Sequence, residues 1–506
     1  MKIKKAIKRF LILTLALIML LTICLAVACE EKPDVVNEKN KNGSETGSET
    51  VPQTREDIPD DLPPNNFSGR EFRVLTRDYD HYAIEIEMAE DSADIVDHAV
   101  YMRNMTVEER FNTKIKAVIV SGSPSDTLTK KLRTDVMAGD VPYEMVSGFM
   151  MALSQMAPEG ILLNWHKLPN MNFGKPWWNK SAMDELTVAG KSFFALSDML
   201  YSPLCASYCV FYNKTLSENY GLDNIYDVVN DGKWTIDYAR NAIKDIYVDL
   251  DNDGQRNSAD LYGWAGNIVS GNVTFLWAFD NPVTKHDSNG IPQLVINNPK
   301  TPQIIDKLHT FWFETKGAIA STPSGIDGIP WFHFGITLMR NSRTIFYPGN
   351  MVEAETDLRD LKDDYGIIPY PKWDENQENY YTMVDGDGSL MAIPNSISSA
   401  ADIDFVTTII EALSAEEYKK VIPAYYEVAL KVKYSRDAES VLMLDKVVEG
   451  IRYDFGFLYD GFVGFGFQMM IDLFNSGSRD FASYYAANEE RVKIHYNNII
   501  QAYLDF

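Results

Sequence analysis

An acidic stretch at 249–260, DLDNDGQRNSAD, is the part of the sequence whose residue types and spacing most clearly suit a chemical task. Oxygen-bearing side chains occupy positions 1, 3, 5, 9 and 12, and Gly254 occupies position 6. Calcium prefers a shell of oxygen ligands, and alternating carboxylates around a glycine turn can wrap such a cation. We therefore predict a structural calcium site formed by Asp249, Asp251, Asp253, Gln255 through its main-chain carbonyl, and Asp260.

A metal-free acidic turn is the alternative for this stretch. Position 12 holds Asp260, whose side chain is shorter than the bidentate glutamate usual there. An amphipathic helix over 237–248 is expected to lead into the loop, but no matching helix is evident after it. Any calcium bound there would be structural, since the loop is expected to lie within one lobe rather than at a ligand cleft.

Two pairs of adjacent aromatic residues form a second group of candidates. Trp177 and Trp178 lie in a polar stretch without periodicity, and Trp331 precedes Phe332. Neighbouring side chains point in different directions, so they are hard to bury together, and aromatic rings offer a flat apolar face to a ligand. We predict Trp177, Trp178 and Trp331 as ligand contacts, with packing at the base of a loop as the alternative.

Catalytic motifs are not evident in the sequence. Neither His-Glu-x-x-His nor Gly-x-Ser-x-Gly occurs, and the seven histidines are scattered singly. Residues 190–192 (GKS) resemble the end of a phosphate-binding loop, but Glu185 stands where that motif needs glycine. We therefore expect no enzyme and no catalytic cofactor. A glycosidase stays open as an alternative, because its carboxylate pair leaves no signature in sequence spacing.

The elements that must position these residues alternate between strand and helix. Strands are expected at 71–76, 113–120 and 143–147, with helices at 95–111 and up to Gly139. This order predicts a parallel sheet, and ligands of such sheets bind beyond the carboxyl ends of the strands. The loops after Arg77 and Gly148 are therefore candidates, and they contribute Asp78, Tyr79 and Phe149.

The N-terminus reads as an export signal rather than as part of the fold. A basic start and an apolar run over 10–28 end in Ala28-Cys29, which predicts a signal peptide at 1–28 and a lipid attached to Cys29. Residues 30–65 hold no aromatic residue, so 29–69 is expected to be a disordered linker. An ordinary signal peptide or an uncleaved anchor are alternatives, and each still exports the protein.

Composition narrows the function further. The 506 residues carry a net charge of −25, which opposes binding to phosphate backbones and argues against nucleic acid as a partner.

The remaining cysteines, Cys205 and Cys209, are four residues apart beside a predicted strand, too far for a disulfide. Both are expected to be buried free thiols.

Five segments in order resemble the extracellular solute-binding proteins of ABC importers, family 1, whose best-known relative is maltose-binding protein. They are GKSFFAL at 190–196, VFYNKTL at 210–216, DGKWT at 231–235, YGIIPYP at 365–371 and LMAIPN at 390–395. The resemblance covers about 71–506. It implies an α/β, two-lobed periplasmic-binding-protein-like fold of type II, with mixed, mostly parallel sheets flanked by helices and hinge strands between the lobes.

The resemblance also implies the arrangement of the lobes. The first lobe would hold 70–199 and 390–432, and the second 200–388 and 434–506. Hinge strands near 195–202 and 385–393 would bring polar residues to the cleft, and sugar hydroxyls bind such carboxylates. These candidates are Ser197, Asp198, Asp385 and Asp387; Asn350 is added because it follows the strand 344–347, where the family often has a stacking aromatic. Solvated acidic turns are the alternative.

The function that the resemblance implies is carbohydrate binding for import. The protein would be a lipid-anchored monomer on the outer face of the cell membrane, and it would deliver an oligosaccharide to the transmembrane subunits of an ABC permease. A secreted glycosidase and a surface glycan-binding module without transport are the alternatives. The sequence does not identify the sugar.

Overall fold

The computed structural model describes residues 54–78, 81–123, 125–434 and 437–505. The predicted signal peptide and the lipid site at Cys29 lie outside these residues, as does Tyr79. Among the described residues, no helix combines the length and apolar character that crossing a bilayer requires.

The first sheet has the strand order β13-β3-β1-β2. Strand β1 pairs in parallel with both β2 and β3, whereas β13 is antiparallel to β3. The sheet therefore confirms the β-α-β-α-β pattern expected from the sequence and adds a strand from far along the chain. Its strands are β1 (Arg70–Arg77), β2 (Thr113–Val120), β3 (Met145–Phe149) and β13 (Ser389–Ala392).

Helices on this sheet begin and end where capping residues allow. Helix α3 (Ile95–Phe111) starts after Asp94, whose carboxylate accepts a hydrogen bond from the main-chain nitrogen of Val96. Helix α4 (Thr127–Ala138) ends at Gly139, which has a φ of 69° and serves as the predicted C-cap. The long helix α14 (Ala400–Ile422) packs against α3, and side chains of both helices share a core with those of β1 and β2.

The second sheet has the order β11-β4-β10-β6-β5, with β9 beside β6. Strand β10 is parallel to β6 and antiparallel to β4, so the sheet is mixed. Its strands are β4 (Tyr208–Asn213), β5 (Tyr247–Val248), β6 (Leu261–Asn267), β9 (Ala318–Ser321), β10 (Thr344–Asn350) and β11 (Tyr365–Ile368). Cys209 and Cys205, in and beside β4, are buried and free, which confirms the predicted thiols.

The remaining elements lie around both sheets and in the connections between them. Those of the first half are η1 (Arg55–Asp57), α2 (His81–Ile84), α5 (Met150–Ser154), η2 (Ala157–Glu159), η3 (Trp165–Lys167), α6 (Lys180–Leu186), α7 (Ser202–Cys205), α8 (Lys214–Asn219), α9 (Ile225–Asn230) and α10 (Ile236–Ile243). Those that follow are α11 (Ser270–Ala278), β7 (Thr284–His286), β8 (Pro292–Leu294), α12 (Lys300–His309), η4 (Thr310–Glu314), α13 (Trp331–Arg340), η5 (Met351–Ala354) and β12 (Thr382–Met383). The last are η6 (Pro423–Tyr434), α15 (Ala438–Glu449), β14 (Ile451–Arg452), α16 (Phe455–Leu458), α17 (Asp460–Val463), α18 (Phe467–Asn475) and α19 (Phe481–Asp505).

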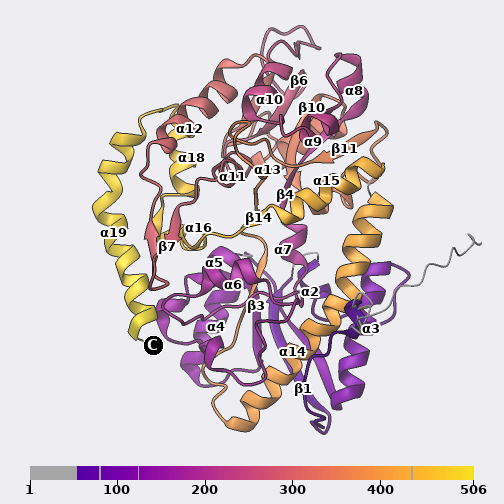
Figure 1. The fold of residues 1–506 in the computed structure, drawn as a ribbon, viewed down its shortest axis with the longest axis vertical. Helices are drawn as coiled ribbons and strands as arrows, with labels where there is room; N and C mark the ends of the chain where they lie inside the picture. The colour runs from indigo at the N-terminus through magenta and orange to yellow at the C-terminus, as the bar shows by residue number, and fades with distance from the viewer. Residues whose placement is uncertain (1–53, 79–80, 124, 435–436, 506) are drawn as a thin grey trace, which may run out of the picture. The chain divides into compact units, whose positions relative to one another are not determined.

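Each sheet and its helices form one lobe of a two-lobed α/β fold, as the sequence predicts (Figure 1). The chain passes between the sheets in the segment that holds α7, again at 384–388 before β13, and a third time along η6. Strand β13 completes the first sheet although the strands nearest to it in sequence belong elsewhere. The lobes are therefore built from discontinuous stretches of chain.

The end of the predicted linker packs against the first lobe. The ring of Phe67 makes an edge-on contact with Phe405 of α14, with ring centroids 4.8 Å apart, and Asp60 accepts a hydrogen bond from Arg110 of α3. The prediction of a disordered linker over 29–69 is thus wrong for 54–69. The reason is that this stretch holds apolar residues, including Phe67 just beyond the aromatic-free region, which the lobe can bury.

The C-terminal segment also departs from its predicted place in the second lobe alone. Just before α19 begins, Arg479 pairs with Asp306 of α12 in the second lobe. Near the other end, the ring of Tyr503 lies 4.9 Å from that of Phe193, which follows the first-lobe helix α6. Figure 1 shows α19 running along both lobes. The C-terminal segment therefore contacts both lobes.

Candidate ligand-binding site

A cavity of about 1000 Å³ lies between the lobes and is the candidate ligand site. Both lobes and the connecting segments line it. The first lobe contributes Tyr82, Asp126, Arg133, Phe149 and Gln155, the connections contribute Ser202, Asp385 and Asp387, and the second lobe contributes Tyr208, Asn267, Trp331, Tyr347, Asn350 and Glu353, among others. Five predicted contacts are thus brought together here: Phe149, Trp331, Asn350, Asp385 and Asp387.

The first-lobe wall follows from the direction of the parallel strands. Phe149 is the last residue of β3, and Tyr82 lies in α2, which follows β1. Carboxyl ends of parallel strands meet at one edge of a sheet, so both side chains reach the cavity from that edge. The basic residues of this wall are already paired, because Lys130 binds Asp126 and Arg133 binds Glu159.

Two carboxyl groups stand where the chain crosses before β13. Asp385 accepts hydrogen bonds from the hydroxyl of Tyr208 at 3.1 Å and from the main-chain nitrogen of Asp387 at 3.1 Å. Burial raises the pKa of Asp385, and burial followed by the charge of Asp385 raises the pKa of Asp387 to about 6, with Arg77 opposing the rise. Donors from a ligand would stabilise these carboxylates in their charged form.

On the second lobe, the end of β10 and the turn after it supply a different kind of carboxyl group. Burial raises the pKa of Glu353 to about 8, so the group is mostly protonated at neutral pH and can donate a hydrogen bond. Its Oε2 has no hydrogen-bond partner among the described residues. Gly349 permits this placement, since a Cβ there would lie 2.4 Å from Oε2 of Glu353.

An aromatic rim stands at the start of α13. Trp331 is half-buried and lines the cavity, and its ring lies edge-on to Phe332 with centroids 5.4 Å apart. Phe332 is 52% exposed and also lines the cavity. Aromatic faces that stay accessible at a cavity mouth suit stacking on the C–H face of a ring-shaped ligand.

Trp177 and Trp178 are not cleft residues, so their prediction as ligand contacts is wrong. Trp177 is 0% exposed and Trp178 is 3% exposed. Each indole nitrogen donates to a carboxylate oxygen of Glu411 in α14, at 3.0 Å in both cases. Adjacent tryptophans can both be buried here because one acidic side chain satisfies both polar edges.

The remaining polar predictions also lie away from the cavity lining. The hydroxyl of Ser197 is buried and pairs with Ser414 of α14 at 2.7 Å. Burial raises the pKa of Asp198 to about 7, and this side chain does not line the cavity either. Asp78 is exposed and accepts a hydrogen bond from Ser121 at 2.5 Å. The predicted first hinge thus serves the core rather than the ligand site.

Sequence reasoning missed Tyr82, Tyr208 and Glu353. Tyr208 begins the strand directly after a crossing between the lobes. That position could have indicated a residue of the ligand site. Glu353 follows the predicted Asn350 by one turn, but a single glutamate in a chain with 72 acidic residues carries no signal of its own. Tyr82 lies on a short helix that the sequence pattern does not indicate.

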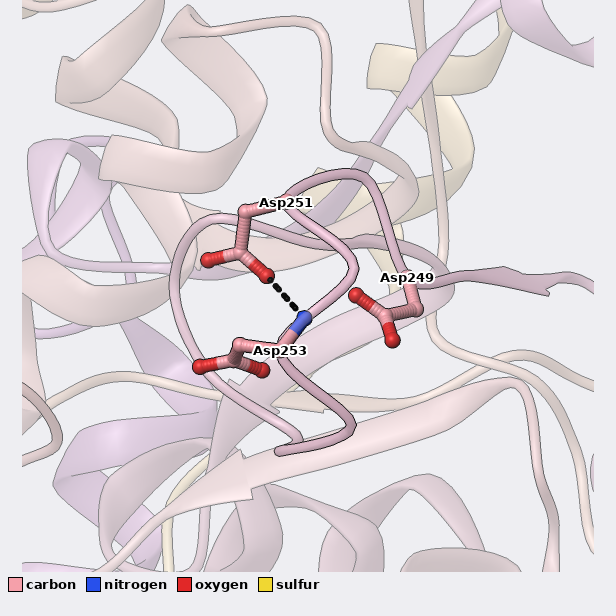
Figure 2. Close-up of side chains that lie close together, drawn as sticks. All are labelled: Asp249, Asp251 and Asp253. Atoms are coloured by element: carbon pink, nitrogen blue, oxygen red, sulfur yellow. Dashed lines mark hydrogen bonds between the residues drawn. The ribbon is translucent and has the colours of Figure 1, made fainter.

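The acidic loop brings three of its predicted ligands together (Figure 2). One carboxylate oxygen from each of Asp249, Asp251 and Asp253 lies within 4.8 Å of the others. Main-chain N–H groups of the loop donate to all three, for example Gly254 to Asp249 at 3.0 Å. Calcium binding by this loop stays a prediction.

The other two predicted ligands are differently placed. Asp260 is fully buried and accepts hydrogen bonds from the main-chain nitrogen of Leu250 at 3.2 Å and the hydroxyl of Tyr262 at 3.3 Å. The carbonyl of Gln255 accepts from the hydroxyl of Tyr247 at 3.3 Å. Neither belongs to the three-carboxylate cluster, so Asp260 links the loop to the sheet below it.

The helix predicted to enter the loop is shorter than expected. Helix α10 ends at Ile243, and Tyr247 and Val248 instead form β5, antiparallel to β6. Aromatic and β-branched side chains favour such pairing. The two ends of the loop are therefore joined by a strand pair, which replaces the helix pair of an EF-hand.

Comparison with known proteins agrees with the fold and with the sequence motifs. The family model described as bacterial extracellular solute-binding protein matches residues 94–305. No curated protein matches the sequence.

Solved structures with a similar fold cover most of the chain at low identity. The cyclic alpha-maltosyl-1,6-maltose binding protein from Arthrobacter globiformis aligns with a TM-score of 0.52 and 14% identity, over 87% of this chain and 100% of that one. The ABC substrate-binding protein Lmo0181 from Listeria monocytogenes, in complex with cycloalternan, gives 0.51 and 13% over 86% and 98%. The galacto-N-biose-/lacto-N-biose I-binding protein of the ABC transporter from Bifidobacterium longum gives 0.51 and 14% over 87% and 98%.

Over residues 94–305 the chain is thus similar to the bacterial extracellular solute-binding proteins, as its sequence motifs predict, and its two-lobed fold agrees with that similarity.

Proposed function

We propose that the cleft binds an oligosaccharide and that the protein delivers it to an ABC permease. The observation that carries the proposal is the cavity of about 1000 Å³ between the lobes, which combines hinge carboxyl groups with an accessible aromatic rim. Carboxylates pair with sugar hydroxyls, and aromatic rings stack on the apolar faces of the sugar. The sugars named for the structurally similar binding proteins support this class of ligand.

Closure of the lobes is part of the proposed function. A ligand shifts a population toward the closed state only if it binds that state more tightly. Asp385 and Asp387 lie at a crossing, Phe149 lies on one lobe, and Trp331 lies on the other, so an occupant of the cavity can contact both walls. We expect the closed state to be favoured only with the bound sugar.

The attachment of the protein to the outer face of the cell membrane is part of the same proposal. A lipid on Cys29 would tether a monomer to the outer face of the cell membrane, and the stretch between Cys29 and Thr54 would leave the lobes room to reach a permease. The description of the matching family model, bacterial extracellular solute-binding protein, supports export. An enzyme is the competing class, and the experiment below separates the two.

Isothermal titration with a panel of maltotetraose, lacto-N-biose, cycloalternan and mixed tripeptides tests the ligand class. We expect at least one sugar to bind, with a smaller radius of gyration in small-angle scattering and no cleavage product by mass spectrometry. Asp387→Asn should weaken binding ~10-fold, whereas Asp140→Asn, an exposed aspartate remote from the cavity lining, should not. Binding of the tripeptides alone would overturn the carbohydrate class, and release of shorter sugars would overturn the binding-protein class.

A further inference from the structure

Arg77, at the end of β1, is buried beside the cleft without using all of its donors. It is 2% exposed, and its Nη2 donates to the carbonyl of Asp387 at 2.9 Å and to the hydroxyl of Ser389 at 2.8 Å. Its Nε and Nη1 have no hydrogen-bond partner among the described residues. The guanidinium carbon lies 3.6 Å from the centre of the Tyr82 ring and 5.8 Å from that of Phe149.

The other fully buried arginine of the first lobe shows how unusual this is. Arg103 pairs with Glu417, and its remaining donors reach the side chain of Asn104 and the carbonyls of Glu85 and Ile86. A buried cation is stable when its donors are satisfied in this way, and it is costly when they are not. Stability alone therefore explains Arg103 but does not explain Arg77.

What Arg77 contacts are parts of the ligand site. Tyr82, Phe149 and Asp387 all line the cavity. The aromatic faces hold the guanidinium by a cation–π contact, which in turn fixes the angle of the Tyr82 ring. The hydrogen bond to Asp387 is made by its main chain, so Arg77 also fixes the turn that carries that carboxyl group into the cleft.

A second set of bonds extends from Arg77 to the first crossing between the lobes. The hydroxyl of Ser389 donates to Glu85 at 3.2 Å, and Glu85 accepts from the main-chain nitrogen of Ser202 at 3.0 Å. Ser202 begins α7 and lines the cavity. Arg77 is thus joined to both crossings that border the ligand site.

We propose that Arg77 is a positioning residue of the ligand site, which holds the ring of Tyr82 and the turn of Asp387 in the geometry that the ligand requires. This inference rests on the proposed function of the cleft. Arg77 acts through the residues it holds, because it does not itself line the cavity. Its planar, charged group suits the task, since lysine offers no flat face for the ring of Tyr82.

The charge of Arg77 has a measurable consequence at Asp387. The charged or titratable groups that act on this carboxyl are Asp385, which raises its pKa, and Arg77, which lowers it; Tyr82 lies close enough to feel Asp387 in turn. Removing Arg77 should therefore raise the pKa of Asp387 above its present value of about 6. If binding needs the carboxylate, acidification should weaken binding in both proteins. The variant should lose affinity at a higher pH than the wild type, because its carboxylate is protonated earlier.

The test compares Arg77→Met and Arg77→Lys with Arg110→Met. Arg110 is a matched control in the same lobe, because it stacks on Phe111 at 4.6 Å and pairs with Asp60 but does not line the cavity. With the panel sugar that binds the wild type most tightly, Arg77→Met should lose about tenfold or more in affinity, and Arg77→Lys should lose less because it keeps the charge. Urea unfolding corrects each value for lost stability, and Arg110→Met should bind normally.

A readout without ligand completes the test. The side-chain carboxyl carbon of Asp387, followed by carbon-13 NMR between about pH 4 and pH 9, should titrate at higher pH in Arg77→Met and near its normal pH in Arg77→Lys. Unchanged titration together with normal affinity in Arg77→Met would overturn the proposal while leaving the binding function intact. If the wild type binds no panel sugar, the proposed function fails, and the titration alone decides the role of Arg77 at Asp387.

Discussion

The carboxylate of Glu411 accepts a hydrogen bond from the indole nitrogen of Trp178 at 3.0 Å. Its second oxygen accepts from Trp177 in the same way. Burial raises the pKa of Glu411 to about 7, and these two bonds oppose the rise. One acidic side chain of α14 thereby anchors the whole loop that precedes α6, and the tryptophans belong to the folding of the first lobe rather than to ligand recognition.

Replacing Trp178 should therefore cost stability and spare affinity. Trp178→Ala removes a buried ring and the indole donor to Glu411, so we expect a loss of about 3–5 kcal/mol in the free energy of unfolding. Urea denaturation measures the loss, and titration with the bound sugar at a temperature where the variant is folded measures affinity. A weaker affinity with unchanged stability would contradict this assignment.

Trp331 should behave in the opposite way. Its ring is half-buried at the cavity mouth, so Trp331→Ala removes a stacking face but little of the core. We expect affinity for the bound sugar to fall ~10-fold, and unfolding to change by less than about 1 kcal/mol. Titration calorimetry and urea denaturation on the same preparation check both values, and Trp331→Phe should restore part of the affinity. Equal affinity in Trp331→Ala would remove the aromatic rim from the site.

Glu85 should make the protein less stable as the pH rises. Burial raises its pKa from 4.5 to about 7, so the folded state holds a proton that the unfolded state releases between these values. The stabilisation is complete below about pH 4.5 and is lost as the pH rises through about 7, which amounts to ~3 kcal/mol at most. Glu85→Gln keeps a neutral partner for Ser202 and Ser389 and should flatten this dependence.

Thermal unfolding of the wild type and Glu85→Gln at several values between about pH 4.5 and pH 8 checks the slope. The difference between the two proteins is the quantity that matters, because other buried carboxyl groups, such as Glu417, titrate in the same range. Parallel curves for the two proteins would show that Glu85 does not contribute.

The acidic loop predicts a response to chelators. If calcium binds Asp249, Asp251 and Asp253, excess EDTA should lower the melting temperature, because a ligand of the native state stabilises it by about 2.7 kcal/mol at a hundredfold excess over Kd. Asp251→Asn should abolish the difference, and Asp140→Asn should keep it. Identical melting of the wild type with and without EDTA would leave the loop as a turn that its own N–H groups stabilise.

The proposed lipid anchor at Cys29 predicts a change in fractionation. Cys29→Ser removes the thiol that would carry the lipid, so the protein should appear in the medium or keep its signal peptide. Immunoblotting of membrane and medium fractions, together with intact mass, checks both outcomes. A membrane-bound variant with the mass of the wild type would show that Cys29 carries no lipid.

The alternation of strand and helix was predictable because it depends on local pattern. Helix α3 and strand β2 begin and end at the residues expected, and Gly139 ends α4 as its backbone freedom suggests. The closing strand β13 is different, because its pairing with β3 joins residues more than two hundred positions apart. No local pattern specifies such a partner, and only the family resemblance suggested it.

The prediction of site residues succeeded where their position depends on the ends of strands. It failed where their position depends on burial. Phe149 and Asn350 follow from strand ends, and both line the cavity. Trp177 and Trp178 were misplaced because their burial is made possible by Glu411, a residue on a helix far along the chain. Sequence spacing shows that two rings are adjacent but not that one distant carboxylate satisfies both.

Because α19 touches both lobes, the motion of one lobe against the other cannot pivot freely about the crossings alone. Arg479, two residues before the helix begins, pairs with Asp306, while the ring of Tyr503 packs on Phe193 near the other end. A rigid rod fastened at two points resists being pulled along its length but tolerates rotation about itself. When the lobes move, the side of the cleft next to α19 should therefore move least, and the side farthest from this helix should travel the greatest distance.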